Sequence, residues 1–286
     1  MVLQIPNLFN QKLFTISPVD DDVLHYEGQK QLPGTSVSTW VIARATLFQT
    51  KTLAGNLTGI YFRKDGLKLY GVDLTGNTIM EYDLEVPWDI STATLLQTGD
   101  ISVEETNARS VFISPDGLKV YVTGWIGDDL NEYDLSPAWD ISTIAINQTV
   151  DFSGDVGANP YDAILKTDGT RMYLTGSGKI CQYDLGTPWD ISTAGAVTTK
   201  TGFDTPGAIF LRDDGLKLYV LGVGSGLVRS YNLGTAWDVS TAKYLRQIEV
   251  SVSGVVFAQG LSFKTDGTKM YVAETNTNIV KEYNLI

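Results

Sequence analysis

The residues that could perform acid–base or nucleophilic chemistry are few in this chain of 286 residues. It contains one histidine, His25, and one cysteine, Cys181. A single histidine excludes metal sites built from two histidines, and it leaves one residue for any histidine-dependent hydrolase. A single cysteine excludes an internal disulfide and a zinc site made of cysteines. We therefore expect no enzymatic activity, no cofactor and no bound metal.

Polar and aromatic residues that do not recur at equivalent positions elsewhere in the sequence are the other candidates for a site. Trp125 precedes Asp128 and Asp129 in one loop, and an exposed tryptophan beside carboxylates suits a sugar or a protein partner. The alternative is that this tryptophan folds over its own strands. Five further residues complete the candidate binding set: Glu104, Glu105, Arg109, Tyr161 and Asp162. Two carboxylates that came within about 5–10 Å of each other could act as general acid and base, but nothing in the spacing requires this.

The elements that must position these residues belong to an internal repeat. Four segments are copies of one sequence: YDLEVPWDIST (82–92), YDLSPAWDIST (133–143), YDLGTPWDIST (183–193) and YNLGTAWDVST (231–241). A second marker, the dipeptide Asp-Gly, ends at Gly66, Gly117, Gly169, Gly215 and Gly267, which are 46–52 residues apart. Such constant spacing indicates the same supersecondary unit each time.

Each unit predicts four β-strands. Strand A precedes the Asp-Gly turn, strand B follows it, strand C leads into the YDL tripeptide, and strand D follows the WDIST segment. The residues 110–124, SVFISPDGLKVYVTG, show the pattern of an apolar run, a turn and a Val/Tyr-rich run. Four short strands per repeat without helical periodicity are typical of a β-propeller blade. We therefore predict an all-β fold.

The termini indicate how the ring closes. The last unit, about 260–285, has strands A to C but no strand D. Near the N-terminus, TWVIARATLFQT (39–50) aligns with PWDISTATLLQT (87–98) and supplies the missing strand. Pairing the two would give five four-stranded blades in residues 40–286 and remove the free sheet edges. Residues 1–39 would then form an arm; alternatively they form a degenerate sixth blade, because 12–27 can be laid on 119–134 without gaps.

Residues that recur in every blade are expected to build the fold. The Asp before each glycine suits a turn, because its side chain bonds the backbone ahead and glycine accepts a positive φ. The basic residue two positions after each glycine is expected to pair with an Asp of its own or the adjacent blade. The Asp of WDIST suits an Asx-turn or a capped helical turn, and we prefer this to a calcium site, which needs 6–8 oxygen ligands. The Trp before it is expected to lie between adjacent blades.

The topology predicts where a binding site would lie. In a propeller the A–B and C–D turns share one face, here called the turn face, and the B–C and D–A loops share the other, the loop face. The turns have nearly the same sequence in every blade, whereas the loops vary. Each of the eight candidate residues lies in one of these loops or directly beside it. The expected inner-strand positions are apolar: Ile60, Val111, Ala163, Ile209 and Leu261. We therefore place the candidate site on the loop face.

A family resemblance follows from these segments. FISPDGLKVYVTG (112–124), FRKDGLKLYGVD (62–73) and FKTDGTKMYVAE (263–274) resemble the repeat of YVTN-type, lactonase-like propellers, over residues 58–286. Propeller lactonases and five-bladed glycosidases carry acidic residues at the inner strands, where this chain offers Asp162. Tachylectin-like five-bladed propellers bind one sugar per blade. The PWDIST spacing resembles propellers of phage and environmental bacterial genomes. The period near 50 residues is longer than is usual for the YVTN-type repeat.

The composition of the chain argues against nucleic acid and membranes as binding partners. The formal net charge is −12, and no cluster of Lys and Arg offers a nucleic-acid site. No apolar run is long enough for a membrane span, and the N-terminal residues do not resemble a secretory signal. We expect a non-catalytic binding or structural propeller, most plausibly a phage virion component such as a tail, receptor-binding or decoration protein, located in the virion or at an extracellular surface. Its expected partners are other virion proteins or further copies of itself, and a host surface glycan is a further candidate. The alternatives are a lectin-like propeller and a lactonase-like or glycosidase-like enzyme.

Overall fold

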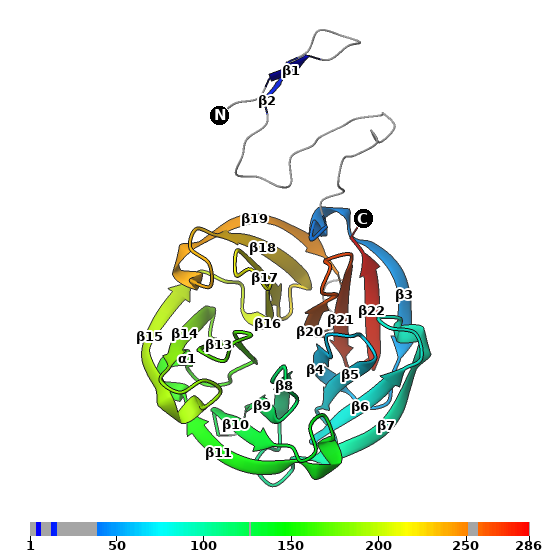
Figure 1. Cartoon of the computed structure of the whole chain (residues 1–286), viewed down its shortest axis with the longest axis vertical. Coiled ribbons are helices and arrows are strands. Elements are labelled where there is room, and N and C mark those ends of the chain that lie inside the picture. The colour runs from blue at the N-terminus through cyan, green and yellow to red at the C-terminus, as the bar shows by residue number, and fades with distance from the viewer. Residues whose placement is uncertain (1–3, 7–12, 16–38, 126, 251–256, 286) are drawn as a thin grey trace.

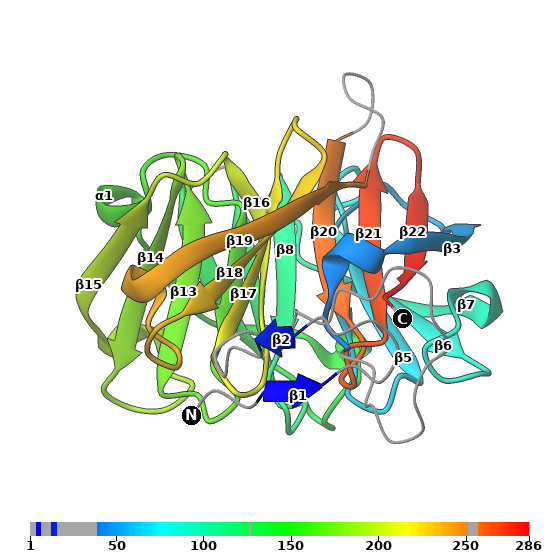
Figure 2. The ribbon, with the colours of Figure 1, turned by 90° about the horizontal axis from the view of Figure 1, so that it is seen from above.

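Five four-stranded antiparallel sheets surround a central axis in the computed structural model of the chain (Figures 1 and 2). The structure describes residues 4–6, 13–15, 39–125, 127–250 and 257–285. In each blade strand A lies innermost and strand D outermost, in the order A-B-C-D. The prediction of a five-bladed all-β propeller is confirmed.

The strands of the blades follow the repeat closely. Blade 1 contains β4 (Leu57–Phe62), β5 (Lys68–Asp73), β6 (Thr78–Leu84) and β7 (Ala93–Asp100); blade 2 contains β8 (Ala108–Ile113), β9 (Lys119–Gly124), β10 (Asp129–Asp134) and β11 (Ala145–Asp151); blade 3 contains β12 (Asp162–Leu165), β13 (Arg171–Gly176), β14 (Lys179–Leu185) and β15 (Ala194–Thr201); blade 4 contains β16 (Pro206–Leu211), β17 (Lys217–Gly222), β18 (Leu227–Leu233) and β19 (Ala242–Glu249); and blade 5 contains β20 (Phe257–Phe263), β21 (Lys269–Thr275), β22 (Ile279–Asn284) and β3 (Thr46–Thr52). A four-residue helix, α1 (Ser153–Val156), lies in the loop between blades 2 and 3.

The ring closes as expected, through a strand near the N-terminus. β3 pairs antiparallel with β22, with Leu47 opposite Tyr283. Because β20 packs directly against β4, the alternative of a sixth blade has no place in the ring. In the N-terminal segment, β1 (Gln4–Pro6) and β2 (Leu13–Thr15) pair with each other and, among the described strands, with no other. The arm predicted for residues 1–39 otherwise lies outside the described residues.

The Asp-Gly turns have the predicted conformation. Each Asp accepts a hydrogen bond from the backbone N–H two residues ahead, as Asp116 does from Leu118 at 3.1 Å. The glycines of these turns have φ between 70° and 74°. A Cβ added to Gly117 would also lie 2.3 Å from the ring of Trp139. Both the backbone conformation and the packing therefore require glycine.

The WDIST segments and their counterpart WVIAR (40–44) form short 3₁₀ helices at the seams between blades. These helices are η1 (Ile42–Arg44), η2 (Ile90–Thr92), η3 (Ile141–Thr143), η4 (Ile191–Thr193) and η5 (Val239–Thr241). The last four have an Asp N-cap that accepts a hydrogen bond from the Ser N–H, which confirms the capped turn.

Each Trp joins its own blade to the preceding one, as predicted. The N–H of Trp88 donates to the carbonyl of Gly66 in the same blade. The hydroxyl of Tyr271, in blade 5, donates to the carbonyl of Trp88 at 2.6 Å. The same Tyr-to-Trp bond recurs at every seam, at 2.6–3.2 Å. The five tryptophans all have φ between 65° and 72°, a strained conformation that the repeated packing maintains.

In blades 1, 2 and 5 the recurring basic residue pairs with a buried glutamate of its own blade, and in blade 3 Arg171 pairs with Asp184. Lys68 contacts the buried carboxylate of Glu81 and also Asp83. Gln97 then donates to Glu81 at 2.8 Å and to Asp140 of blade 2 at 3.0 Å. Thus in blades 1, 2 and 5 a buried glutamate receives the basic charge, beside the expected aspartate in blades 1 and 2. In these three blades a glutamine links the glutamate to the Asp at the next seam.

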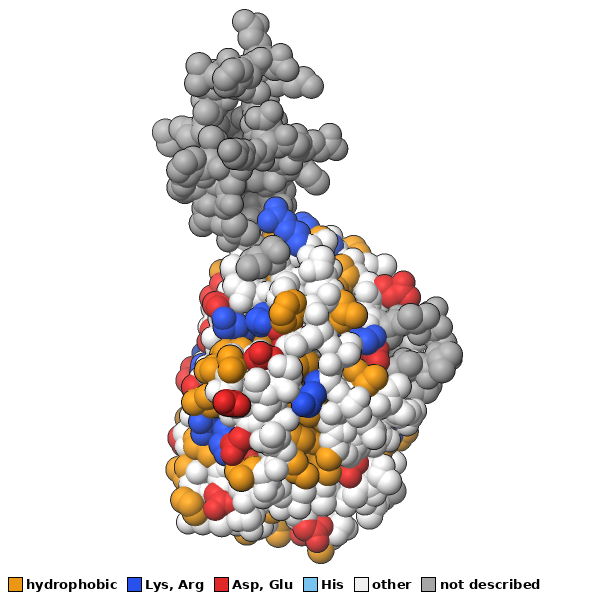
Figure 3. Space-filling model, turned by 90° about the vertical axis from the view of Figure 1, so that its right-hand side faces the viewer, with side chains coloured by type: hydrophobic (Ala, Val, Ile, Leu, Met, Phe, Trp, Pro, Cys, Tyr) orange, Lys and Arg blue, Asp and Glu red, His pale blue; other side chains and the backbone are white. Residues whose placement is uncertain are grey.

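The outer strands expose a mixed surface. Figure 3 shows hydrophobic, basic and acidic side chains interspersed on the side of β3 and β7. Exposed hydrophobic residues of these two strands include Leu47, Phe48, Leu95 and Leu96.

Candidate functional site

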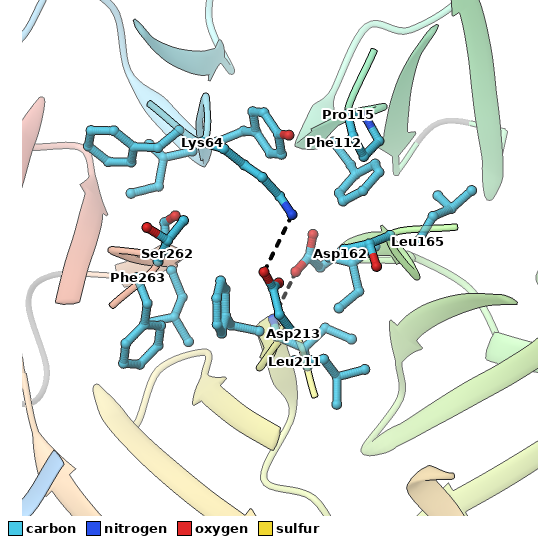
Figure 4. A pocket seen from close by; sticks show the side chains of 18 of the residues that line it. Lys64, Phe112, Pro115, Asp162, Leu165, Leu211, Asp213, Ser262 and Phe263 are labelled. Atoms are coloured by element: carbon cyan, nitrogen blue, oxygen red, sulfur yellow. Dashed lines mark hydrogen bonds and ion pairs between the residues drawn. The ribbon is translucent and has the colours of Figure 1, made fainter. Parts of the chain in front are cut away.

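A cavity of about 130 Å³ lies on the axis of the ring, toward the turn face. The innermost strands of all five blades wall it (Figure 4). Its mouth is formed by the residues that immediately precede the five Asp-Gly pairs: Lys64, Pro115, Thr167, Asp213 and Thr265. The cavity therefore opens on the face opposite to the one expected to carry the site.

The walls of this axial cavity are apolar and rich in aromatic rings. Four of the five predicted inner-strand residues line it, namely Ile60, Val111, Ile209 and Leu261, whereas Ala163 is fully buried. Aromatic rings line the cavity from four blades, among them Tyr61, Phe112, Phe210 and Phe263. Such walls favour an apolar group over water.

Asp162 is the one carboxylate in the inner part of the cavity among the described residues that line it. Its side chain points toward the axis (Figure 4), and the residue is 8% exposed. Its Oδ2 accepts the N–H of Ile209, in blade 4, at 2.8 Å. Burial raises the pKa of Asp162 to about 7, while hydrogen bonds from Ile209, Ser110 and Ala163 act in the opposite direction. The group can therefore change charge near neutral pH.

An ion pair crosses the mouth. Lys64 Nζ of blade 1 and Asp213 Oδ2 of blade 4 are 3.4 Å apart (Figure 4), and their side chains are 52% and 62% exposed. Exposed pairs of this kind contribute only about 0–1 kcal/mol. The pair can consequently separate at little cost when a molecule enters or leaves.

At the loop face a side-chain bridge spans the inner strands. Arg109 of β8 donates from Nη1 to Gln259 Oε1 of β20 at 3.0 Å, across the intervening blade 1. Its guanidinium lies 3.5 Å from the centre of the Trp125 ring, and Trp125 contacts Tyr161 edge-on at 5.5 Å. Burial lowers the pKa of Arg109 to about 10, while Tyr161 and Glu105 act in the opposite direction. We call this group the Arg109 bridge.

The structure thus brings several predicted residues together, but as a packed group. Trp125 is only partly exposed, which agrees with the alternative that it folds over its own strands. Glu105 is 1% exposed and so close to Gly124 that a Cβ there would lie 1.3 Å from its Oε2. Glu104 is half-buried in the same loop.

The remaining predicted residues lie in neighbouring positions with their own partners. Asp128 accepts the N–H of Asn159 at 2.6 Å, and Asp129 accepts from Asn131 at 3.1 Å. Burial raises the pKa of the Asp129 carboxyl, and the nearby charges of Asp151 and Asp128 raise it further. These two carboxylates therefore fasten the loop. In the described part of the chain, no group of three or more His, Cys, Asp and Glu side chains is arranged to hold a metal.

The mouth residues Lys64 and Asp213 were missing from the sequence-based set. Their signal is the position before each Asp-Gly, which is Lys, Pro, Thr, Asp and Thr in the five blades.

Comparisons with known proteins identify the fold. No family model and no curated protein matches the sequence. Among solved structures, the β-propeller domain of Cps50 (Swd1) from Myceliophteria thermophila is 11% identical with a TM-score of 0.52, over 83% of this chain and 100% of that one. A protein from Lactobacillus plantarum is 19% identical (TM-score 0.46), over 77% of this chain and 64% of its own.

Lactonase-like propellers are also among the similar structures. A Bacteroides uniformis protein provisionally assigned as a 6-phosphogluconolactonase is 16% identical with a TM-score of 0.48, over 79% of this chain and 65% of its own. The chain thus spans slightly less than two thirds of these bacterial proteins. The likeness to the Cps50 domain supports the β-propeller fold and extends to the fold alone. No helix in the described residues is long and apolar enough to cross a membrane.

Proposed function

We propose that the chain is a non-catalytic binding propeller. The observation that supports this most directly is the axial cavity, which has apolar walls, a single inner carboxylate and a weakly paired mouth. Rigid, largely apolar cavities with a few placed polar groups are typical of ligand sites. The surrounding ring is fixed by the Tyr-to-Trp bonds at every seam, so the cavity exists before a ligand arrives.

Filling the cavity tests this proposal. Ligand-observed NMR with small aromatic fragments is expected to detect binding to the full chain. Val111→Phe, which adds bulk to the cavity wall, should abolish the signal, whereas Val103→Phe should not, because Val103 is 87% exposed. Fragment binding that is equal in both variants would place the site elsewhere.

More specifically, we propose that the protein is a component of a phage virion. The support is the resemblance of the PWDIST turns to phage propellers and the pairing of β1 with β2 outside the blades. Co-purification with virions is expected, and deletion of residues 1–39 should abolish it while the ring still folds. A protein that remains free of virions in infected cells would contradict this form of the proposal.

Hydrolysis is a second candidate function, favoured by one observation. Asp162 and Asp213 both line the cavity, and a carboxyl whose pKa is about 7 suits a general acid. Nitrophenyl glycosides and lactones are the substrates to test. Turnover that disappears in Asp162→Asn would replace the non-catalytic proposal with this one.

A lectin role for the loop face has weaker support. One face of the Trp125 ring is already covered by Arg109, so a sugar would have to use the other. Glycan-array binding that is lost in Trp125→Ala would favour that role.

A further inference from the structure

We propose that the axial cavity binds an organic monocation, an alkylammonium or arylalkylammonium whose head group reaches Asp162 while its apolar stem lies against the aromatic wall. This inference rests on the proposed binding function and adds the chemical class of the ligand. The ammonium could belong to a free amine or to a lysine side chain of a partner, and the two sources share this chemistry.

The inner end of the cavity supplies an acceptor for the head group. Strand β12 runs from the loop face toward the turn face, so Asp162, its first residue, lies far from the mouth. The carboxylate is held in place by the Ile209 N–H at 2.8 Å and by hydrogen bonds from Ser110 and Ala163. An ionised carboxylate has about four acceptor positions, so about one position remains to accept from an ammonium.

The walls suit the stem. Tyr61 and Phe112 meet edge-on at 5.5 Å, and Phe210 and Phe263 are 4.9 Å apart, so rings approach the axis from several blades. Rings of this kind attract a cation passing over their faces. The volume of about 130 Å³ is close to that of a cavity of about 150 Å³ that holds benzene, so a single phenyl ring or a short alkyl chain fits.

The charged groups of the cavity favour a positively charged ligand. Among the residues that the structure describes, the charged groups that line the cavity are Asp162, Lys64 and Asp213. Because Lys64 and Asp213 pair with each other across the mouth, the unpaired charge at neutral to basic pH is that of Asp162. A monocation neutralises it, whereas an anion would add a second buried negative charge, which is costly.

The pH dependence provides an independent signature. Within the described part of the chain, the other ionisable groups that line the cavity are Lys64, Tyr61 and Asp213. The strands packed against β12 add Arg109 on β8, Lys119 and Tyr121 on β9, and Arg171 and Tyr173 on β13. Burial raises the pKa of Tyr61, and the pKa of Arg109 is about 10, so neither changes charge between pH 6 and pH 8. Since the pKa of Asp162 is about 7, the affinity for an ammonium should rise about tenfold over that interval, in proportion to the ionised fraction of this carboxyl.

Calorimetric titration of the full chain tests the inference. The probes are phenethylammonium, its neutral analogue phenethyl alcohol, its anionic analogue phenylacetate, and Nα-acetyl-lysine N-methylamide. At pH 8.5 we expect phenethylammonium to bind more tightly than both analogues, and Asp162→Asn to weaken it at least about 30-fold. Glu249→Gln removes an equal charge from the exposed outer strand β19 and should leave the affinity unchanged.

The outcomes separate the two proposals. Binding of the lysine derivative as well as the amine would support a protein partner, and binding of the amine alone would support a free ligand. If phenethyl alcohol binds as tightly as the amine, and equally to Asp162→Asn, the monocation is wrong while the binding function stands. If no probe binds, the inferred ligand class is wrong, and the fragment-binding test then decides on the binding function separately. Should Asp162→Asn fail to fold, the pH profile of the unaltered protein decides: an affinity that is constant from pH 6 to pH 8 would overturn the inference.

Discussion

Asp162 should make the stability of this protein fall as pH rises, and Asp162→Asn should remove that effect. The pKa of the buried carboxyl is about 7, against 3.8 for the exposed group. The folded state therefore holds a proton that the unfolded state has released between these values. The stabilisation is fully present below pH 3.8 and is lost as pH rises through 7. With about 3 units of difference at 1.36 kcal/mol each, the total is about 4 kcal/mol.

Urea unfolding at intervals from pH 4 to pH 8 measures this effect. Many carboxylates titrate in the acid range, so the informative quantity is the difference in unfolding free energy between the original protein and Asp162→Asn. This difference should decrease by about 1.4 kcal/mol per pH unit between pH 4 and pH 7. Val111→Ala, which shortens a neighbouring wall residue without a titratable group, should keep the original slope. A difference that stays constant across the range would refute the assignment of Asp162 as a proton-holding group.

Other perturbations test the seams and turns of the ring. Gly117→Ala should cost at least about 2 kcal/mol of unfolding free energy, because φ is 74° and a Cβ would meet an indole; Gly154→Ala, with open space around it, should cost little. Tyr271→Phe should cost about 1–3 kcal/mol by leaving the Trp88 carbonyl without its donor, whereas Tyr244→Phe, at a position 56% exposed, should be close to neutral. If melting in 1 mM EDTA occurs several degrees lower, the expectation of no structural cation is wrong.

The repeated features could be predicted from the sequence because they follow from local rules. An Asp-Gly pair specifies its turn whatever surrounds it, and its recurrence every 46–52 residues identifies the blade. The closing strand β3 was predictable for the same reason, since Trp40 belongs to a fifth copy of the seam and donates its N–H to Gly267. Spacing within a repeat is a property of the chain alone.

The candidate site depends on contacts that no local rule contains. Arg109 and Gln259 are 150 positions apart and meet only because the ring brings β8 and β20 to one axis. Lys64 and Asp213 are 149 positions apart and meet for the same reason. Sequence reasoning found the unusual residues of the loop face, but whether Trp125 is free or covered depends on the Arg109 side chain, whose reach only the structure gives.

The position of Asp162 within the repeat explains how one blade can differ without disturbing the ring. The residues six positions before the Asp of each Asp-Gly pair are Gly59, Ser110, Asp162, Ala208 and Gly260. Four of these residues are small. Where neighbouring strands approach most closely, only glycine fits, because a Cβ on Gly59 would lie 2.6 Å from the Cα of Ser110. The small neighbours leave space on the axis for a single larger side chain. A second acid at this level would face Asp162 across the axis and raise the cost of burying both charges. The fivefold repeat thus provides the frame, and the one position at which a blade departs from its small equivalents places a titratable group in the wall of the axial cavity.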